Sequence, residues 1–321
     1  MAKVIATKPS PVEGTDSRRS EGMTFVIPAF NEEAAIGQIV AELAELIGSL
    51  GREVQILVID DGSSDRTASV SASIPGVEVI RHPRNRGYGA ALKTGIQHAN
   101  HDLVMIMDGD GTYSPLDASV LIENFEKEKA DMVVGARTGT NASIPWVRRP
   151  AKWAITRLAS YVAGTPIPDV NSGMRLFRAS LVRKILHLLP DGFSFTTTLT
   201  LALLMNGYLI DHAVIRYGKR YGRSKIRPIA DTLGFIQLIL RLALLFAPMK
   251  IFLPMAGALL CLAAVWAFAT WRFAGRLADA STAVIAMTGV QIGVLGLLAE
   301  LINSRVPKVD EPSEKDLGKP G

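Results

Sequence analysis

Short apolar runs alternate with amphipathic stretches along the first half of the chain. Consecutive apolar positions are typical of strands buried on both faces, so the runs predict strands over residues 23–27, 54–59, 77–80, 103–107 and 132–135. The stretches between them carry apolar residues at helical spacing and predict helices over residues 36–50, from 64 onward, 87–100 and 117–129. This alternation indicates a doubly wound α/β fold with a mostly parallel sheet and right-handed crossovers.

Local signals set the limits of the first β-α unit. Pro28 is expected to close the first strand. Asn31 is expected to cap the helix that follows, with Glu32 and Glu33 in its favourable first turn. Gly51 is expected to end this helix before the second strand begins.

After Leu233 the chain becomes strongly apolar. Residues 232–247 are apolar but interrupted by Arg241, which predicts a helix lying along the bilayer surface. Residues 251–271 are uncharged, and about 20 apolar residues cross a bilayer, so they predict one transmembrane helix and residues 283–299 a second. Two buried core helices are the alternative, but so little charge over such lengths favours a membrane hairpin.

The charges that flank the two predicted spans indicate their orientation. Basic residues before the first span, together with Arg305 and Lys308 after the second, outnumber Arg272 and Arg276 between them. The positive-inside rule therefore predicts an integral membrane protein whose N-terminal domain and both termini are cytoplasmic. The basic cluster at residues 219–227 fits anionic lipid beside the membrane better than it fits nucleic acid, so no nucleic-acid partner is expected.

Composition adds two further constraints. The 321 residues carry a net charge of +5 and a single cysteine, Cys261, which excludes a disulfide within the chain. Residues 1–22 are polar without a hydrophobic stretch, which predicts a disordered leader and no signal peptide. The predicted organisation is a leader over 1–22, an α/β domain over 23–230, an interfacial helix over 231–248, a transmembrane hairpin over 249–305 and a polar cytoplasmic tail over 306–321.

The strongest chemical signal is a pair of carboxylates after the central predicted strand. Asp108 and Asp110 flank Gly109 directly after residues 103–107. Ligands of open α/β sheets bind beyond the carboxyl ends of the strands, and side chains two residues apart share a face. Asp108 and Asp110 are therefore expected to hold Mg²⁺ or Mn²⁺, with a diphosphate supplying further oxygen ligands. A polar turn that merely ends the strand is the alternative.

Acidic and polar residues also follow two other predicted strands. Asn31 and Glu32 follow the first strand, and Asp60 and Asp61 follow the second. Glu32 and Asp61 are candidates to accept hydrogen bonds from the base and ribose of a nucleotide. The dinucleotide motif G-x-G-x-x-G is absent, because Leu92 stands at the third glycine position, and no P-loop motif occurs.

The motifs at residues 28–33, 60–65 and 108–110 resemble those of the GT-A-fold family 2 glycosyltransferases. Within that group the chain is most similar to the polyprenyl-phosphate (dolichyl- or undecaprenyl-phosphate) sugar transferases, over residues 23–230 and into the apolar tail. The resemblance implies a GT-A (nucleotide-diphospho-sugar transferase) fold and an enzyme that transfers one hexose, with inversion, from a GDP- or UDP-linked sugar to a polyprenyl phosphate. The residues implied for the donor are Pro28, Phe30, Glu32, Ile59, Asp61, Asp108, Gly109 and Asp110.

Two later stretches extend the resemblance. Residues 169–178 form a turn leading into a strand and match the family's Asp-x-x-Ser-Gly motif, and residues 220–225 match its phosphate-covering Arg-x-Gly-x-Ser-Lys loop. The catalytic residues implied are Asp110, Arg137, Ser172, Arg220 and Lys225. Thr112 stands where many relatives have a metal-binding glutamine, so its own role as a ligand is open.

No general base is expected. Threonines occupy residues 196–198, where many relatives place a glutamate that could act as a base. The five histidines are expected to be structural or surface residues, and their spacing is not that of metal ligands. A phosphate acceptor needs no base, because with a second pKa of about 6 it is largely dianionic at neutral pH.

Two other functions are less consistent with the sequence: a processive polysaccharide synthase and a catalytically silent scaffold. A processive polysaccharide synthase would carry more spans and a Gln-x-x-Arg-Trp motif, and the sequence has neither. A catalytically silent, nucleotide-binding membrane scaffold is disfavoured by the intact charged motifs. The sequence leaves open the donor (GDP-mannose, UDP-glucose or UDP-GlcNAc), the lipid, homo-oligomer formation, and any role of the hairpin beyond anchoring to membrane lipids.

Overall fold

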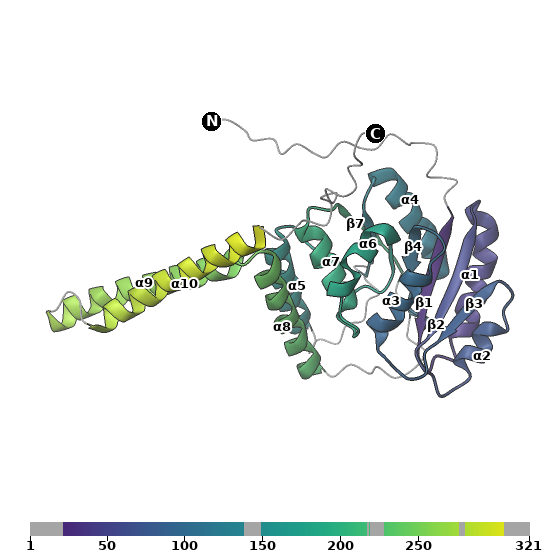
Figure 1. The fold of residues 1–321 in the computed structure, drawn as a ribbon, viewed down its shortest axis with the longest axis horizontal. Coiled ribbons are helices and arrows are strands. Elements are labelled where there is room, and N and C mark those ends of the chain that lie inside the picture. The colour runs from purple at the N-terminus through teal and green to yellow at the C-terminus, as the bar shows by residue number, and fades with distance from the viewer. Residues whose placement is uncertain (1–21, 138–148, 217, 219–227, 276–279, 305–321) are drawn as a thin grey trace, which may run out of the picture.

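A computed structural model describes residues 22–137, 149–216, 218, 228–275 and 280–304. An α/β domain comes first, and two long helices project away from it (Figure 1). The strands are β1 (Met23–Ala29), β2 (Val54–Asp60), β3 (Val77–Arg81), β4 (Leu103–Ile106), β5 (Met132–Ala136), β6 (Arg175–Arg178) and β7 (Ile210–Val214). The helices are α1 (Ile36–Leu50), α2 (Thr67–Ala72), α3 (Tyr88–His98), η2 (Pro115–Asp117), α4 (Ala118–Glu128), α5 (Arg149–Ala163), α6 (Ala179–Ile185), η4 (Leu186–Leu188), α7 (Phe195–Met205), α8 (Pro228–Phe246), α9 (Met249–Ala274) and α10 (Ala280–Ser304).

The strands form one seven-stranded sheet in the order β3-β2-β1-β4-β6-β5-β7. β6 is antiparallel to both of its neighbours, and the other pairs are parallel. This confirms the predicted mostly parallel sheet. β7, α6 and α7 were not predicted; the β7 segment contains Asp211 and His212 and therefore has no continuous apolar run.

Both faces of the sheet are buried, as the continuous apolar runs predicted. Along β1, Phe25 and Ile27 belong to a core shared with α1 and α4. Val26 belongs to a second core shared with α3, α6 and α7. The carboxyl ends of the central strands emerge between these two helix layers, at the edge where ligands of such sheets bind.

The first strand continues through Pro28, whereas the sequence predicted that Pro28 would close it. The carbonyl oxygen of Ala29 accepts from the backbone N–H of Asp61, which directly follows β2. The carbonyl oxygen of Val26 accepts from the backbone N–H of Met107, which directly follows β4. Backbone groups alternate sides along a strand, so Pro28 faces β4, which has already ended at Ile106. The missing N–H of Pro28 therefore costs no ladder hydrogen bond.

The hairpin consists of two helices that are long and apolar enough to cross a bilayer, Met249–Phe273 and Ala280–Asn303. Its base is joined to the α/β domain by hydrogen bonds. Lys250 Nζ donates to Val162 O (2.7 Å), the Tyr161 hydroxyl to Lys250 O (2.7 Å) and Asn303 Nδ2 to Phe246 O (3.0 Å). α8 covers much of the predicted interfacial segment, but its Ile239, Leu242 and Ala243 are buried in a core that it shares with α5 and α7.

We expect Gly296→Leu to separate the two hairpin helices. A Cβ at Gly296 would lie 2.6 Å from Phe252 Cβ, so a larger side chain cannot fit at this helix contact. Overpacking should destabilise the detergent-solubilised protein by about 1–3 kcal/mol. The melting temperature measures this effect, with Gly257→Leu as the matched control, because a Cβ at Gly257 meets nothing within 4 Å. Equal melting temperatures for the two variants would contradict the packing seen here.

Candidate functional site

A cavity of about 330 Å³ opens at the carboxyl ends of the central strands. Its walls come from the ends of β1, β2 and β4, the start of α3, and the segments at residues 171–173 and 193–196. It brings together seven of the residues that the sequence singled out: Pro28, Phe30, Glu32, Asp61, Asp108, Gly109 and Asp110. These residues are far apart in the sequence, and the parallel sheet places them at one edge.

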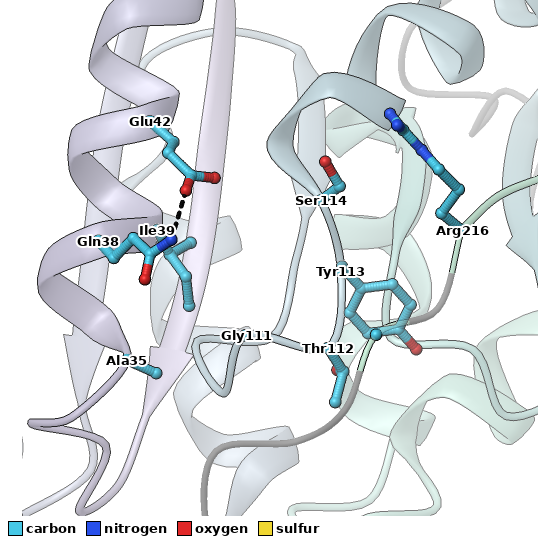
Figure 2. Close-up of a pocket in the computed structure, with 10 residues that line it drawn as sticks. Ala35, Gln38, Ile39, Glu42, Gly111, Thr112, Tyr113, Ser114 and Arg216 are labelled. Atoms are coloured by element: carbon cyan, nitrogen blue, oxygen red, sulfur yellow. Dashed lines mark hydrogen bonds between the residues drawn. The ribbon is translucent and has the colours of Figure 1, made fainter. Parts of the chain in front are cut away.

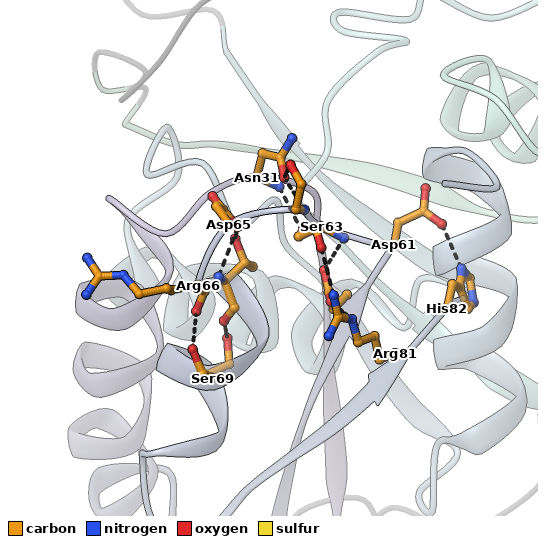
Figure 3. A network of polar contacts seen from close by, with 12 residues as sticks. Asn31, Asp61, Ser63, Asp65, Arg66, Ser69, Arg81 and His82 are labelled. Carbon is orange, nitrogen blue, oxygen red and sulfur yellow. Dashed lines mark hydrogen bonds and ion pairs between the residues drawn. The ribbon is translucent and has the colours of Figure 1, made fainter. Parts of the chain in front are cut away.

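The adjacent carboxylates Asp60 and Asp61 at the end of β2 have different surroundings; Figure 3 shows Asp61 facing His82. Asp60 is fully buried, and its Oδ1 accepts from the Ser63 backbone N–H at 3.0 Å, which closes the turn. Asp61 lines the cavity and accepts from His82 Nδ1 (2.7 Å) and from the backbone N–H groups of Arg86 (2.9 Å) and Gly87 (2.8 Å). Asp60 therefore shapes the turn, and Asp61 fixes the start of α3 against the cavity.

Asn31 does not cap α1, which begins only at Ile36. Its backbone is left-handed (φ 54°), its N–H donates to Ser63 Oγ at 2.9 Å, and its Oδ1 accepts from the Ser64 N–H at 2.9 Å. Asparagine tolerates this conformation better than most residues. Asn31 thus joins the turn after β1 to the turn after β2, and Figure 3 shows it at the centre of these contacts.

Asp110 is oriented by its own turn. Its Oδ1 accepts from the Thr112 hydroxyl at 2.6 Å and from the Thr112 N–H at 3.1 Å, and the residue is 7 % exposed. Thr112 therefore supports the carboxylate of Asp110 and is not part of the wall of this cavity. β4 ends at Ile106, so both carboxylates lie in the turn after the strand, not on one strand face as expected.

Asp108 lies between a tyrosine and a glycine. The Tyr88 hydroxyl donates to Asp108 Oδ1 at 2.7 Å. Burial, and then the charge of Asp108, raises the pKa of Tyr88 well above its ordinary value, so the phenol stays protonated and remains a donor. On the other side, a Cβ built at Gly173 would lie 2.2 Å from Asp108 Oδ2. Only glycine leaves room for the carboxylate in this position.

The donor set suits a hard divalent cation that takes its other ligands from elsewhere. Among the residues that the structure describes, no group of three or more His, Cys, Asp or Glu side chains could hold a metal ion. Asp108 and Asp110 nevertheless supply carboxylate oxygens at one cavity wall. Mg²⁺ typically binds through one or two carboxylates together with substrate phosphates and water. The pair therefore fits a cation that arrives with a diphosphate.

Arg137 and Ser172 are not among the residues that line the cavity. Arg137 forms a bidentate ion pair with buried Asp169, through Nε to Oδ2 (2.6 Å) and Nη2 to Oδ1 (2.9 Å). Ser172 is fully buried, whereas its neighbours Asn171 and Gly173 reach the cavity. The direct roles that the resemblance implies for Arg137 and Ser172 therefore stay predictions.

Arg175 is a buried cation that the sequence reading left without a role. It is fully buried, and it donates to Ser172 O (2.8 Å), Val170 O (2.8 Å) and Thr200 Oγ1 (2.5 Å). Burial lowers the pKa of Arg175 to about 10, so the guanidinium remains charged near neutral pH. By binding two carbonyls, it fixes the loop that carries Asn171 and Gly173.

The remaining predicted residues fall elsewhere. Ile59 is fully buried in the core under α3, so it does not line the cavity as expected; its position in β2 turns its side chain inward. Arg220 and Lys225 lie outside the described residues, as do the predicted leader and tail. All five histidines lie in the part of the chain that the structure describes, and none of them lines this cavity.

The sequence predicted no role for Tyr88, which lines the cavity. Asn171, Gly173 and Phe193 also line it; they lie in matched stretches, but none was named as a site residue. A signal for Tyr88 was present, because two glycines flank it where a helix begins after a strand. Gly87 has φ 106°, and a Cβ at Gly89 would lie 2.2 Å from Pro190 O. Gly87 and Gly89 do not complete a dinucleotide motif; they allow close backbone packing at the start of α3.

A second cavity, of about 240 Å³, is lined by residues 111–114 and by residues of α1 (Figure 2). It is bordered by α1, where Gln38 Nε2 donates to Glu42 Oε1 at 2.7 Å, and by Arg216. Neither Asp108 nor Asp110 lines it. The first cavity, with both carboxylates, is therefore the candidate active site.

We expect Gly173→Ala to weaken cation binding without unfolding the protein. The backbone of Gly173 is not left-handed, so alanine can adopt it, but the added methyl would push the Asp108 carboxylate aside. Changes around metal ligands typically cost about 10–100-fold in affinity, and a loss of on the order of tenfold is expected here. Titration of Mn²⁺ in the presence of a nucleoside diphosphate measures it. Gly48→Ala, which meets nothing within 4 Å, is the control, and equal affinities would contradict the geometry.

Comparison with known proteins agrees with this architecture. Residues 24–186 match the family model of glycosyl transferase family 2, and residues 247–304 match that of the GtrB C-terminal hairpin. The first match covers the sheet as far as β6 and both carboxylates. The second covers α9 and α10.

Several curated proteins are similar in sequence. Dodecaprenyl-phosphate galacturonate synthase of Rhizobium johnstonii is 26% identical over 227 residues, which are 69% of this chain and 67% of that protein. Dolichyl-phosphate hexose transferase of Haloferax volcanii is 29% identical over 65% of this chain and 89% of its own. Undecaprenyl-phosphate 4-deoxy-4-formamido-L-arabinose transferase of Edwardsiella ictaluri is 30% identical, but the match spans only 54% of each protein.

Solved structures share the fold. Mannosyl-3-phosphoglycerate synthase from Rubrobacter xylanophilus superposes with a TM-score of 0.57 at 21% identity, over 72% of this chain and 77% of that one. Glucosyl-3-phosphoglycerate synthase from Mycobacterium tuberculosis, crystallised with Mn²⁺, UDP-glucose and phosphoglyceric acid, gives a TM-score of 0.55 at 21% identity, over 74% and 84% of the two chains. The predicted GT-A fold is thus confirmed, and the chain belongs to glycosyl transferase family 2, with a GtrB-type hairpin at its C-terminal end.

Proposed function

We propose that the protein transfers a single hexose, with inversion, from a nucleoside diphosphate sugar to a polyprenyl phosphate. One observation carries the proposal: Asp61 and the pair Asp108 and Asp110 line one cavity, in a domain whose helices are hydrogen-bonded to an apolar hairpin. The similar proteins named above are a dodecaprenyl-phosphate galacturonate synthase, a dolichyl-phosphate hexose transferase and an undecaprenyl-phosphate 4-deoxy-4-formamido-L-arabinose transferase. An acceptor confined to the bilayer also gives a physical reason for a membrane anchor.

The proposed donor site follows the cavity from β2 to β4. Phe30, Glu32 and Asp61 would surround the base and ribose, with Asp61 held in place by three donors. The diphosphate would lie over Gly109, between the two carboxylates. Bound there, Mg²⁺ or Mn²⁺ would neutralise the diphosphate and stabilise it as a leaving group.

In the proposed reaction, an oxygen of the acceptor phosphate attacks the anomeric carbon of the sugar. A new carbon–oxygen bond forms on one face while the bond to the nucleoside diphosphate breaks on the other, and the departing diphosphate takes the electron pair. No proton must be removed, because a phosphate monoester with a pKa of about 6 is largely dianionic at neutral pH. This is consistent with a cavity whose wall includes Thr196 and no histidine.

Positive groups would bring donor and acceptor phosphates together despite their repulsion. Arg137 is oriented by its bidentate ion pair with Asp169 and would present a fixed guanidinium at the edge of the site. Ser172 and the loop around it would be held by buried Arg175. Arg220 and Lys225 are proposed to contact phosphate on the strength of their loop motif alone. Positioning of this kind lowers the entropic part of the barrier.

The proposed orientation places the α/β domain and both termini in the cytoplasm, on the charge pattern around the spans. Lys250 and Tyr161 join α9 to α5 through hydrogen bonds of 2.7 Å each. These bonds would hold the cavity at a set height above the membrane, where a lipid phosphate is found.

The test is transfer of radiolabelled sugar from UDP- and GDP-linked donors into organic-extractable lipid. The protein is purified in detergent with undecaprenyl or dolichyl phosphate and Mg²⁺ or Mn²⁺. We expect label in the lipid fraction with one class of donor. Label in a water-soluble polymer would favour a processive synthase instead. A complete lack of product with every donor would favour a catalytically silent scaffold.

A further inference from the structure

Tyr88 has no role in the proposed chemistry, although it lines the candidate active site and contacts Asp108. It is the first residue of α3 and lines the cavity. Its hydroxyl donates to Asp108 Oδ1 at 2.7 Å. A hydrogen bond to a carboxylate is stronger than one between neutral groups, so this contact restricts rotation of the carboxylate.

The ring of Tyr88 is itself fixed by a second aromatic residue. It stacks on Phe193, with ring centroids 5.7 Å apart and an angle of 15° between the planes. Phe193 is 62 % exposed and also lines the cavity. The stacking contact between the two rings holds the plane of Tyr88.

The backbone under this stack has little freedom to move. The Ala90 N–H donates to Asp191 O at 3.0 Å, and Lys93 Nζ pairs with Asp191 Oδ1 at 2.7 Å. The absent Cβ of Gly89 leaves α3 in close contact with Pro190 O. The start of α3 and residues 190–193 therefore form one packed unit around Tyr88.

We infer that Tyr88 is a positioning residue, whose hydroxyl holds the Asp108 carboxylate in the orientation that receives a divalent cation. Phe193 keeps the Tyr88 ring in place, and the absent side chain of Gly173 leaves room for the carboxylate. The inference rests on the proposed function, because it takes Asp108 as a cation ligand. An orientation set in advance raises affinity, since less freedom is lost when the cation binds.

The test is Mn²⁺ binding by Tyr88→Phe, measured by electron paramagnetic resonance of free Mn²⁺ in the presence of UDP or of GDP. This variant keeps the stacked ring and removes only the hydroxyl. We expect the Kd for Mn²⁺ to rise about tenfold, as for other changes around metal ligands, with an unchanged melting temperature. In transfer assays, the Mn²⁺ concentration for half-maximal rate should rise by a similar factor, and kcat should recover at high Mn²⁺.

Tyr161→Phe is the matched control. It also loses one tyrosine hydroxyl that donates a 2.7 Å hydrogen bond, but at the α5–α9 junction, so its Kd for Mn²⁺ should not change. Phe193→Ala should raise the Kd for Mn²⁺, as Tyr88→Phe does. Phe193→Tyr keeps an aromatic ring at this position and should keep the wild-type Kd. Equal Mn²⁺ binding by wild type and Tyr88→Phe would overturn this inference alone. No Mn²⁺ binding by the wild type with either nucleotide would overturn the proposed cation site, and this inference with it.

Discussion

Asp110→Asn is expected to lower the rate of sugar transfer by about 10³-fold, which corresponds to about 4 kcal/mol of transition-state stabilisation. Asparagine has the size of aspartate, and its carbonyl oxygen can still accept from the Thr112 hydroxyl and N–H. The turn should therefore persist, while the negative charge that binds the cation is lost. The measurement is the initial rate of transfer into lipid at saturating donor, with the melting temperature recorded alongside.

The control for this substitution is Asp131→Asn. Asp131 directly precedes β5, at the opposite edge of the sheet from the cavity, and its Oδ2 accepts from the Leu209 N–H at 2.8 Å. The same change of chemistry there should leave the rate within about twofold, as surface substitutions usually alter little. If Asp110→Asn retained the wild-type rate with its fold intact, Asp110 would have no part in the reaction.

The second large effect is expected from Arg137→Ala. The ion pair with Asp169 is bidentate, and Asp169 is 2 % exposed, so removing Arg137 leaves a buried carboxylate without that cation. Breaking a buried ion pair by removing one partner typically costs about 3–5 kcal/mol. Because Arg137 is only half-buried and its charge is partly screened by solvent, we expect a loss of about 3 kcal/mol in the free energy of unfolding. Urea unfolding in detergent measures this loss. The transfer rate should also fall, by on the order of 10²-fold, through lost phosphate stabilisation.

A double-mutant cycle with Asp169→Ala separates the two roles of Arg137. The stability losses should not add, because the two residues form one ion pair. If Arg137 contacts phosphate, Arg137→Ala should lose more activity than Asp169→Ala. Equal activity losses in both single variants and the double variant would mean that the pair only supports the loop at residues 169–173.

Much of the fold could be predicted because its signals are local. Continuous apolar runs marked the strands that are buried on both faces, and Gly51, at φ 63°, ended α1 as expected. The hairpin was predicted from length and lack of charge alone. What local pattern could not supply was β7, whose segment is not continuously apolar.

In the candidate site, too, the residues with a local sequence signal could be predicted and the others could not. Asp61, Asp108 and Asp110 were predicted to meet because parallel strands end at a common edge, and all three line the cavity. One expectation failed on side-chain environment: Ile59 matches a family position but is buried in the core. Thr112, whose role the sequence left open, donates to Asp110 and does not line this cavity. Tyr88 was missed because its partner, Asp108, is 20 residues away and is brought near only by the packing of α3 on the sheet.

The most direct test of the central claim is the mass of the lipid product. Purified protein is incubated with polyprenyl phosphate and the preferred nucleotide sugar, with Mn²⁺, with excess chelator, and with Mn²⁺ restored after chelation. We expect a lipid heavier by one hexose unit, formed only when the cation is present and recovered when it is restored. A product of unchanged yield in excess chelator, or one carrying a chain of sugars, would contradict it.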